Sequence, residues 1–113
     1  QDFVYIHVQA PDECGHRNEL ENKIKRISLI DHLVLQPLLK GLEKFGDYSV
    51  MVLPDHPTPI STRTHASDPV PYLIYRSNQG VDSGVVCFDE EQAAATGNRV
   101  MQGHLLMPRF LQK

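Results

Sequence analysis

The first forty residues combine one short apolar run with one long amphipathic stretch. Residues 3–8 (FVYIHV) are almost continuously apolar, which is typical of a strand buried on both faces of a parallel sheet. Pro11 ends this run, and further on apolar residues recur at steps of three and four. Such spacing predicts a helix with a buried stripe. Pro37 falls inside the stripe and should kink the helix or start a new one, because proline has no N–H to donate. The stripe consists of Leu20, Ile24, Ile27, Ile30, Val34, Leu38 and Leu42.

The rest of the chain has shorter elements. Apolar runs predict strands at 48–53 (YSVMVL) and 72–75 (YLIY), and the proline-rich residues 57–71 between them predict an extended loop. Asp89 is a predicted N-cap for a short helix that ends at Gly97, and residues 103–111 predict a last short helix. Because strands and helices alternate, the sequence predicts an α/β fold in which the apolar stripe is core and not a partner groove.

Composition narrows the class of protein. The 113 residues fit one domain with a modest core. The net charge of −3 argues against a generic nucleic-acid partner, because no basic excess can neutralise phosphates. No apolar run approaches the roughly 18 residues that span a membrane. Cys14 and Cys87 lie too far apart in sequence for a disulfide framework or a zinc ribbon. The expected location is the cytoplasm.

Potential metal ligands follow the first two predicted strands. Asp12 and His16 come after the first strand, the adjacent pair Asp55 and His56 comes after the second, and His65 lies in the following loop. Because ligands of open α/β sheets bind at the carboxyl ends of strands, we expect these side chains to converge. A spacing of four residues places Asp12 and His16 on one side of a helix. Carboxylate and imidazole together suit manganese or zinc.

The number of donors favours two ions over one. Five protein ligands exceed what one tetrahedral ion needs, whereas two ions about 3.5–4 Å apart favour in-line phosphoryl displacement. Asp55 and His56 reach a single ion only from a bent loop, because successive side chains diverge along extended backbone. Local roles are the alternative, since Asp12 could cap the following helix and Asp55 could stabilise the turn into Pro57. The residues alone leave both interpretations open.

Two longer segments carry a family resemblance. Residues 10–27 (APDECGHRNELENKIKRI) and 53–75 (LPDHPTPISTRTHASDPVPYLIY), with the ending GHLLMPRFL, resemble the cofactor-independent phosphoglycerate mutases of the archaeal-type branch. These enzymes belong to the alkaline phosphatase superfamily. The resemblance implies a three-layer αβα sandwich. Residues 1–113 would form the C-terminal part of its sheet with flanking helices, and the N-terminal part and an inserted domain would be absent from this chain.

The resemblance also implies roles for individual residues. Asp12, His16 and His65 match the ligands of one metal ion, and Asp55 and His56 match ligands of a second. Both ions would be manganese, or else zinc or cobalt, and 2,3-bisphosphoglycerate would not be required. No catalytic residue is expected in this segment, because the nucleophilic Ser or Thr of the family lies upstream.

Arg63 has two interpretations. Its side chain could face a substrate phosphate, or it could make a structural bond to a loop carbonyl.

The activity implied is interconversion of 3-phosphoglycerate and 2-phosphoglycerate through a phosphoenzyme, in glycolysis and gluconeogenesis. The partners would be this small-molecule substrate and the remainder of the catalytic domain, without nucleic acid or membrane, and the oligomeric state stays open. We expect the segment alone to be inactive. The alternatives are another two-metal phosphotransferase or phosphatase of the superfamily, such as a homoserine-kinase-like relative, and a fragment that only binds metal.

Overall fold

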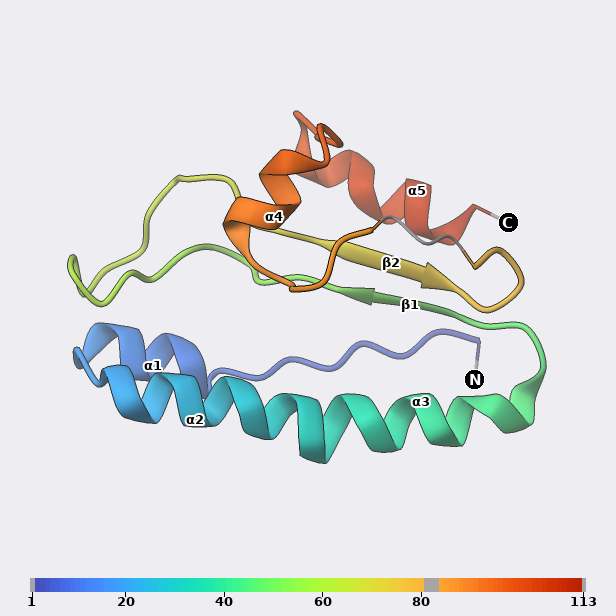
Figure 1. The fold of residues 1–113 in the computed structure, drawn as a ribbon, viewed down its shortest axis with the longest axis horizontal. Coiled ribbons are helices and arrows are strands. Elements are labelled where there is room, and N and C mark those ends of the chain that lie inside the picture. Colours follow the sequence, from blue (N-terminus) through green and yellow to red (C-terminus); the bar gives the residue numbers. More distant parts are fainter. Residues whose placement is uncertain (1, 81–83, 113) are drawn as a thin grey trace. The chain divides into compact units, whose positions relative to one another are not determined.

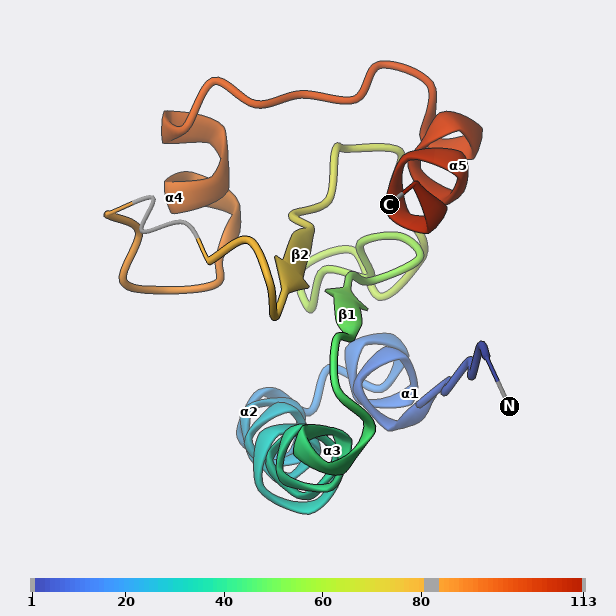
Figure 2. The ribbon, with the colours of Figure 1, turned by 90° about the vertical axis from the view of Figure 1, so that its right-hand side faces the viewer.

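A computed structural model describes residues 2–80 and 84–112 of the chain and divides it into two compact units. Unit 1 comprises Gln1–Lys44 and His56–Asp68, and unit 2 comprises Phe45–Asp55 and Pro69–Lys113. Figure 1 gives the order of the elements along the chain, and Figure 2 shows the same ribbon turned by 90°. Among the residues described, no helix is both long enough and apolar enough to cross a membrane.

Unit 1 begins its regular structure with two packed helices. Helix α1 spans Ala10–His16 and carries a proline and two acidic residues in its first turn, where a missing N–H costs nothing and negative charge is favoured. Asn18 follows with a φ of 58°, a left-handed conformation that Asn adopts more readily than most residues. This conformation lets the chain turn into α2, Leu20–Ile30, which packs against α1.

The long amphipathic stretch is helical throughout, but the type of helix changes along it. A π-helical turn, Asp31–Leu35, separates α2 from α3, Gln36–Leu42, and a 3₁₀ turn, Glu43–Phe45, follows. Pro37 lies in the first turn of α3, so the prediction that it starts a new helix is confirmed. Helix interruptions of this kind usually have an identifiable cause, and here a proline without an N–H is present.

The prediction that the apolar stripe forms a core is wrong for this chain. Leu20 and Ile24 are each 58% exposed, and Ile27 is 52% exposed. An amphipathic helix buries its stripe only against another apolar face. Unit 1, which holds these helices, contains no strand among its described residues that could cover the stripe.

The predicted first strand is also absent. Residues 3–8 run extended in Figure 1, but they form no strand and are exposed, with Tyr5 71% exposed. A strand requires a hydrogen-bonded neighbour, and the two strands among the described residues pair only with each other. The prediction of a buried strand at residues 3–8 is therefore wrong for this chain, although the backbone there is extended.

Unit 2 contains that sheet. Strands β1, Ser49–Val52, and β2, Leu73–Arg76, are antiparallel, with Val50 opposite Tyr75. The predictions of strands at 48–53 and 72–75 are confirmed to within one residue at each end. Helices together with a small sheet are consistent with the α/β class, and Val50 is the buried residue of the pair.

The helices of unit 2 confirm the predictions made from capping residues. Helix α4 spans Glu90–Ala95, and the Asp89 carboxylate accepts the Gln92 N–H at 2.7 Å. A 3₁₀ turn, Gly103–Leu105, leads into α5, Leu106–Leu111. The Arg76 guanidinium of β2 donates to two carbonyl oxygens of α5, those of Arg109 and Phe110, at 2.9 and 3.2 Å. These bonds satisfy carbonyls that a helix end leaves unpaired.

Candidate metal centre

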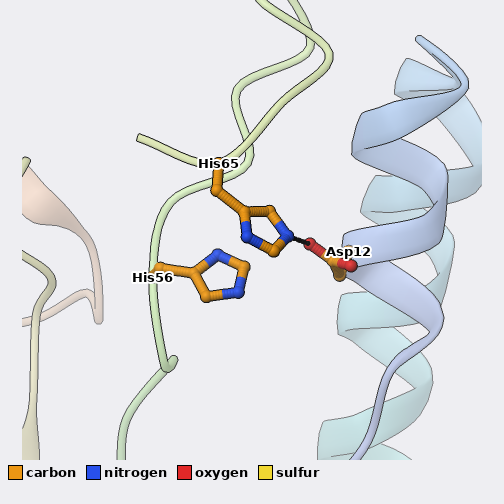
Figure 3. Close-up of side chains that lie close together, drawn as sticks. All are labelled: Asp12, His56 and His65. Atoms are coloured by element: carbon orange, nitrogen blue, oxygen red, sulfur yellow. Dashed lines mark ion pairs between the residues drawn. The ribbon is translucent and has the colours of Figure 1, made fainter. Parts of the chain in front are cut away.

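Three potential metal ligands of unit 1 come together from a helix and a loop. Asp12 projects from the first turn of α1, and His56 and His65 lie in the loop of residues 56–68. Each of the three offers one donor atom, and these atoms all lie within 4.8 Å of one another. Figure 3 shows the two imidazoles side by side and facing the carboxylate. Their ring centroids are 3.6 Å apart.

His16 joins this group on the other oxygen of the Asp12 carboxylate. Its Nε2 lies 3.3 Å from Oδ2, whereas the Nε2 of His65 lies 3.3 Å from Oδ1. The spacing of four residues on α1 therefore places Asp12 and His16 on one side of the helix, as predicted. The Asp12 and His16 side chains are only 34% and 39% exposed, so the group is neither sealed nor fully solvated.

The backbone of the loop brings His56 and His65 together. The Ala66 N–H donates to the Pro57 carbonyl at 2.9 Å, which closes the loop at its base. Inside it, the Arg63 N–H donates to the Pro59 carbonyl at 2.9 Å. Residues nine positions apart in sequence thereby become neighbours, and the fixed φ angles of the prolines favour this turn.

A threonine of the loop contacts the Asp12 ligand directly. The Thr58 hydroxyl donates to Asp12 Oδ1 at 2.5 Å and lies 3.3 Å from His56 Nδ1. This hydrogen bond to the charged form is the main reason that the pKa of Asp12 lies below 3.8, and the nearby His16, His65 and His56 act in the same direction, while burial opposes them. The position of Thr58, two residues after His56, is the one signal in the sequence for this contact.

His16 is oriented by the backbone of Arg63. Its Nδ1 lies 2.9 Å from the Arg63 carbonyl oxygen, which accepts the Nδ1 proton. In a neutral imidazole, that hydrogen bond places the proton on Nδ1 and leaves the lone pair on Nε2, as a metal-bound imidazole requires. Arg63 has a φ of 54°, so a left-handed backbone presents this carbonyl.

The side chain of Arg63 also has a structural partner. With its amide oriented to satisfy both neighbours, Asn18 accepts from Arg63 Nη2 and donates to the Ile60 carbonyl, each at 3.1 Å. The Arg63 guanidinium thus has a structural partner, which is the Asn18 side chain and not the loop carbonyl named in the prediction. Asn18 carried no signal in the sequence beyond its position after a helix.

Asp55 is the predicted ligand that this group does not include. It is the last residue of the first segment of unit 2, whereas His56 belongs to unit 1. Of the five predicted ligands, the structure thus unites Asp12, His16, His56 and His65. His56 lies with Asp12 and His65, although the family resemblance assigns it to the other ion.

The donor set fits a divalent transition metal. One carboxylate and several imidazoles are the ligands that manganese and zinc share, and at least one imidazole has the second-nitrogen hydrogen bond common in metal-binding histidines. The ligand atoms converge from two segments of one compact unit. Such a group can hold a cation and present it to an anionic substrate.

Curated proteins of similar sequence cover nearly the whole chain. A probable 2,3-bisphosphoglycerate-independent phosphoglycerate mutase from Geobacter sulfurreducens is 43% identical over 99% of this chain and 28% of its own length. The enzyme of that name from Methanothrix thermoacetophila is 47% identical over 94% of this chain and 27% of its own length. The chain thus spans about a quarter of the length of the curated relatives it matches.

No solved structure matches the chain. The family description that does match is that of the metalloenzyme superfamily, over residues 1–106. Nearly the whole chain is covered, including every residue of the metal-ligand group described above. The chain therefore belongs to the metalloenzyme superfamily.

Proposed function

We propose that this chain is the metal-binding, C-terminal part of a cofactor-independent phosphoglycerate mutase that interconverts 3-phosphoglycerate and 2-phosphoglycerate through a phosphoenzyme. The observation that carries the proposal is the convergence of Asp12, His16, His56 and His65 in one unit. The names of the similar proteins supply the mutase activity, and the family resemblance supplies the phosphoenzyme. The activity would serve glycolysis and gluconeogenesis in the cytoplasm, with no need for 2,3-bisphosphoglycerate.

The proposed ligand sets follow the family resemblance. Asp12, His16 and His65 would hold one divalent ion, and Asp55 and His56 would contribute to a second, with manganese as the proposed metal. When bound, such ions stabilise an alkoxide nucleophile and neutralise charge on a transferring phosphoryl group. Within this chain, the Arg63 carbonyl orients His16 and the Thr58 hydroxyl orients Asp12. Residues outside the chain would supply the Ser or Thr nucleophile and the groups that grip phosphoglycerate.

The remaining part of the catalytic domain is the proposed partner of the exposed apolar segments. Residues 3–8 and the stripe on α2 would complete a three-layer αβα sandwich of the alkaline-phosphatase type, with residues 1–113 as its C-terminal part. Two features support this proposal. The extended run lacks a strand neighbour among the described residues, and Leu20, Ile24 and Ile27 are half exposed. Burial of such surface stabilises by about 25 cal/mol per Å².

Metal binding without catalysis is the second candidate. It is favoured by the state of Thr58, whose hydroxyl lies within the ligand group but is buried and donates its proton to Asp12. Because this hydroxyl is buried, it is not accessible to a substrate. A different phosphotransferase or phosphatase of the superfamily would share the same ligands, and only basic residues that contact the substrate would separate it from a mutase.

The metal site can be tested by calorimetry with manganese on the full chain. We expect His16→Ala and Asp55→Ala to weaken binding by at least about tenfold, because each removes a ligand. His104→Ala is the matched control, since His104 is an exposed histidine of unit 2 outside the ligand group. Equal affinity in all the variants would refute the metal site.

Activity can be tested separately. The chain alone should not interconvert the phosphoglycerates, whereas a complete polypeptide that contains it should do so. Phosphatase activity without mutase activity in that polypeptide would favour the alternative.

A further inference from the structure

The metal-ligand group contains one buried hydroxyl with an unusual position. Thr58 is 5% exposed and is the only polar residue that is buried in the described part of the chain. A buried hydroxyl needs a hydrogen-bond partner. Here the acceptor is Oδ1 of Asp12, 46 residues away in sequence. The one buried polar side chain of the described residues therefore forms its hydrogen bond with a candidate metal ligand.

This hydrogen bond restricts a torsion that is otherwise soft. The terminal torsion of an aspartate is broad, because rotation of its carboxylate meets little resistance. Thr58 fixes Oδ1 on one side, while the imidazoles of His65 and His16 lie 3.3 Å from Oδ1 and Oδ2 respectively. The plane of the Asp12 carboxylate is thereby set with both oxygens turned toward the histidines that would share its ion.

Thr58 is itself held by a second helix. The Lys23 ammonium of α2 donates to the Thr58 carbonyl at 2.7 Å, in a partly buried contact. Gly15 of α1 allows this close approach, since a Cβ there would lie only 2.9 Å from Thr58 Cγ2 and 3.1 Å from Lys23 Nζ. Charge-assisted hydrogen bonds are stronger than neutral ones, so the ammonium fixes the loop firmly against α2.

From these contacts we propose that Thr58 is a positioning residue that orients the Asp12 carboxylate for metal binding, and that Lys23 holds Thr58 in the position to do so. The inference rests on the proposed metal site and adds to it two residues outside the set of ligands. The physical basis of the effect of Thr58 on metal binding is preorganisation. A carboxylate already turned toward the other ligands loses less freedom when the ion binds.

The test compares isosteric and conservative variants of the full chain. Thr58→Val keeps the shape and removes the hydroxyl, while Thr58→Ser keeps the hydroxyl and removes the methyl. Lys23→Met keeps the apolar stem and removes the ammonium, and Lys25→Met is its control at an exposed lysine of the same helix. The measurements are the dissociation constant for manganese by calorimetry, the visible spectrum of bound cobalt, and folding by circular dichroism.

We expect Thr58→Val to weaken manganese binding by about 10–100-fold, as loss of an orienting partner usually does, and to change the cobalt spectrum. Thr58→Ser should restore both to within about threefold, and Lys23→Met should fall between the two. Wild-type affinity in Thr58→Val would overturn the proposal. Equal loss in Thr58→Ser and Thr58→Val would also overturn it, because packing of the methyl would then be the cause.

Two further variants separate this proposal from the metal site itself. If His16→Ala abolishes binding and Thr58→Val does not, the metal site stands and the positioning role falls. If the wild-type chain binds no manganese, both fall. A double-mutant cycle of Thr58→Val and Asp12→Asn, measured by urea unfolding without metal, tests the contact independently. Additive effects in that cycle would count against the hydrogen bond that the proposal requires.

Discussion

Substituting Gly15 by alanine would test whether α1 and the loop are as tightly joined as the structure shows. Gly15 lies in α1 where the carbonyl of Thr58 crosses the helix. An added Cβ would overlap that carbonyl oxygen and would lie 2.9 Å from Thr58 Cγ2. The Thr58 carbonyl is part of the backbone and accepts a hydrogen bond from the Lys23 ammonium. It therefore cannot rotate aside as the end of a flexible side chain would.

Three contributions set the magnitude. Alanine is favoured over glycine in a helix by about 1 kcal/mol, which would stabilise the variant. If the loop stays in place, overpacking costs about 1–3 kcal/mol. If the loop moves away instead, the hydrogen bond from the Lys23 ammonium is lost at about 1.5–3 kcal/mol. Either response matches or outweighs the gain in helix propensity, and the net expected destabilisation is about 0–2 kcal/mol.

Gly41→Ala is the matched control for this prediction. Gly41 is also helical, in α3, and a Cβ there would meet nothing within 4 Å. It should therefore show only the gain in helix propensity, up to about 1 kcal/mol. Urea unfolding followed by circular dichroism measures both free energies, and calorimetry should show weaker manganese binding for Gly15→Ala alone. Equal stabilisation by the two substitutions would refute the reasoning.

Three further predictions concern the groups that orient the site and unit 2. Arg63→Gly should keep manganese affinity within about threefold, whereas Arg63→Val should lower it about tenfold. The reason is that valine resists the left-handed φ that presents the Arg63 carbonyl to His16. Equal affinities of the two variants by calorimetry would contradict this. The lowered pKa of Asp12 means that its ionised form stabilises the folded chain above pH 3.8 and that this stabilisation is lost as the pH falls through the lowered value. Thr58→Val removes the main cause, so acid unfolding in metal-free buffer should move to higher pH, and an unmoved acid midpoint would count against the cause assigned. Arg76→Met should weaken protection of the α5 amides from hydrogen exchange and destabilise the chain by about 1 kcal/mol, because carbonyls of α5 lose their donor; unchanged protection would show that the bonds contribute nothing.

Elements governed by neighbouring residues were predictable from the sequence. Asp89 caps α4 because its carboxylate reaches an N–H three residues away, and Pro37 lies in the first turn of α3 because of its own covalent structure. Elements that depend on distant partners were not. Residues 3–8 have the apolar pattern of a buried strand, but a strand exists only where another strand bonds to it.

The same distinction between neighbouring and distant residues applies to the candidate site. The spacing of Asp12 and His16 within one helical turn placed them together from sequence alone. Thr58 and Lys23 could not be found in this way, because their contacts join residues 46 and 35 positions apart and depend on how the loop lies against two helices. Residue type identifies a ligand, whereas only the fold identifies the group that orients it.

The loop shows why such orienting groups lie where they do. Both contacts that orient ligands on α1 come from it, since Thr58 donates its hydroxyl to Asp12 and the Arg63 carbonyl accepts from His16. Pro57 and Pro59 limit the conformations that the loop can adopt when unfolded, which lowers the entropy lost when it closes. Their carbonyls also accept the hydrogen bonds that close it. The loop therefore fixes the geometry of the ligands before an ion binds. Part of the conformational entropy that metal binding would otherwise remove is already lost during folding.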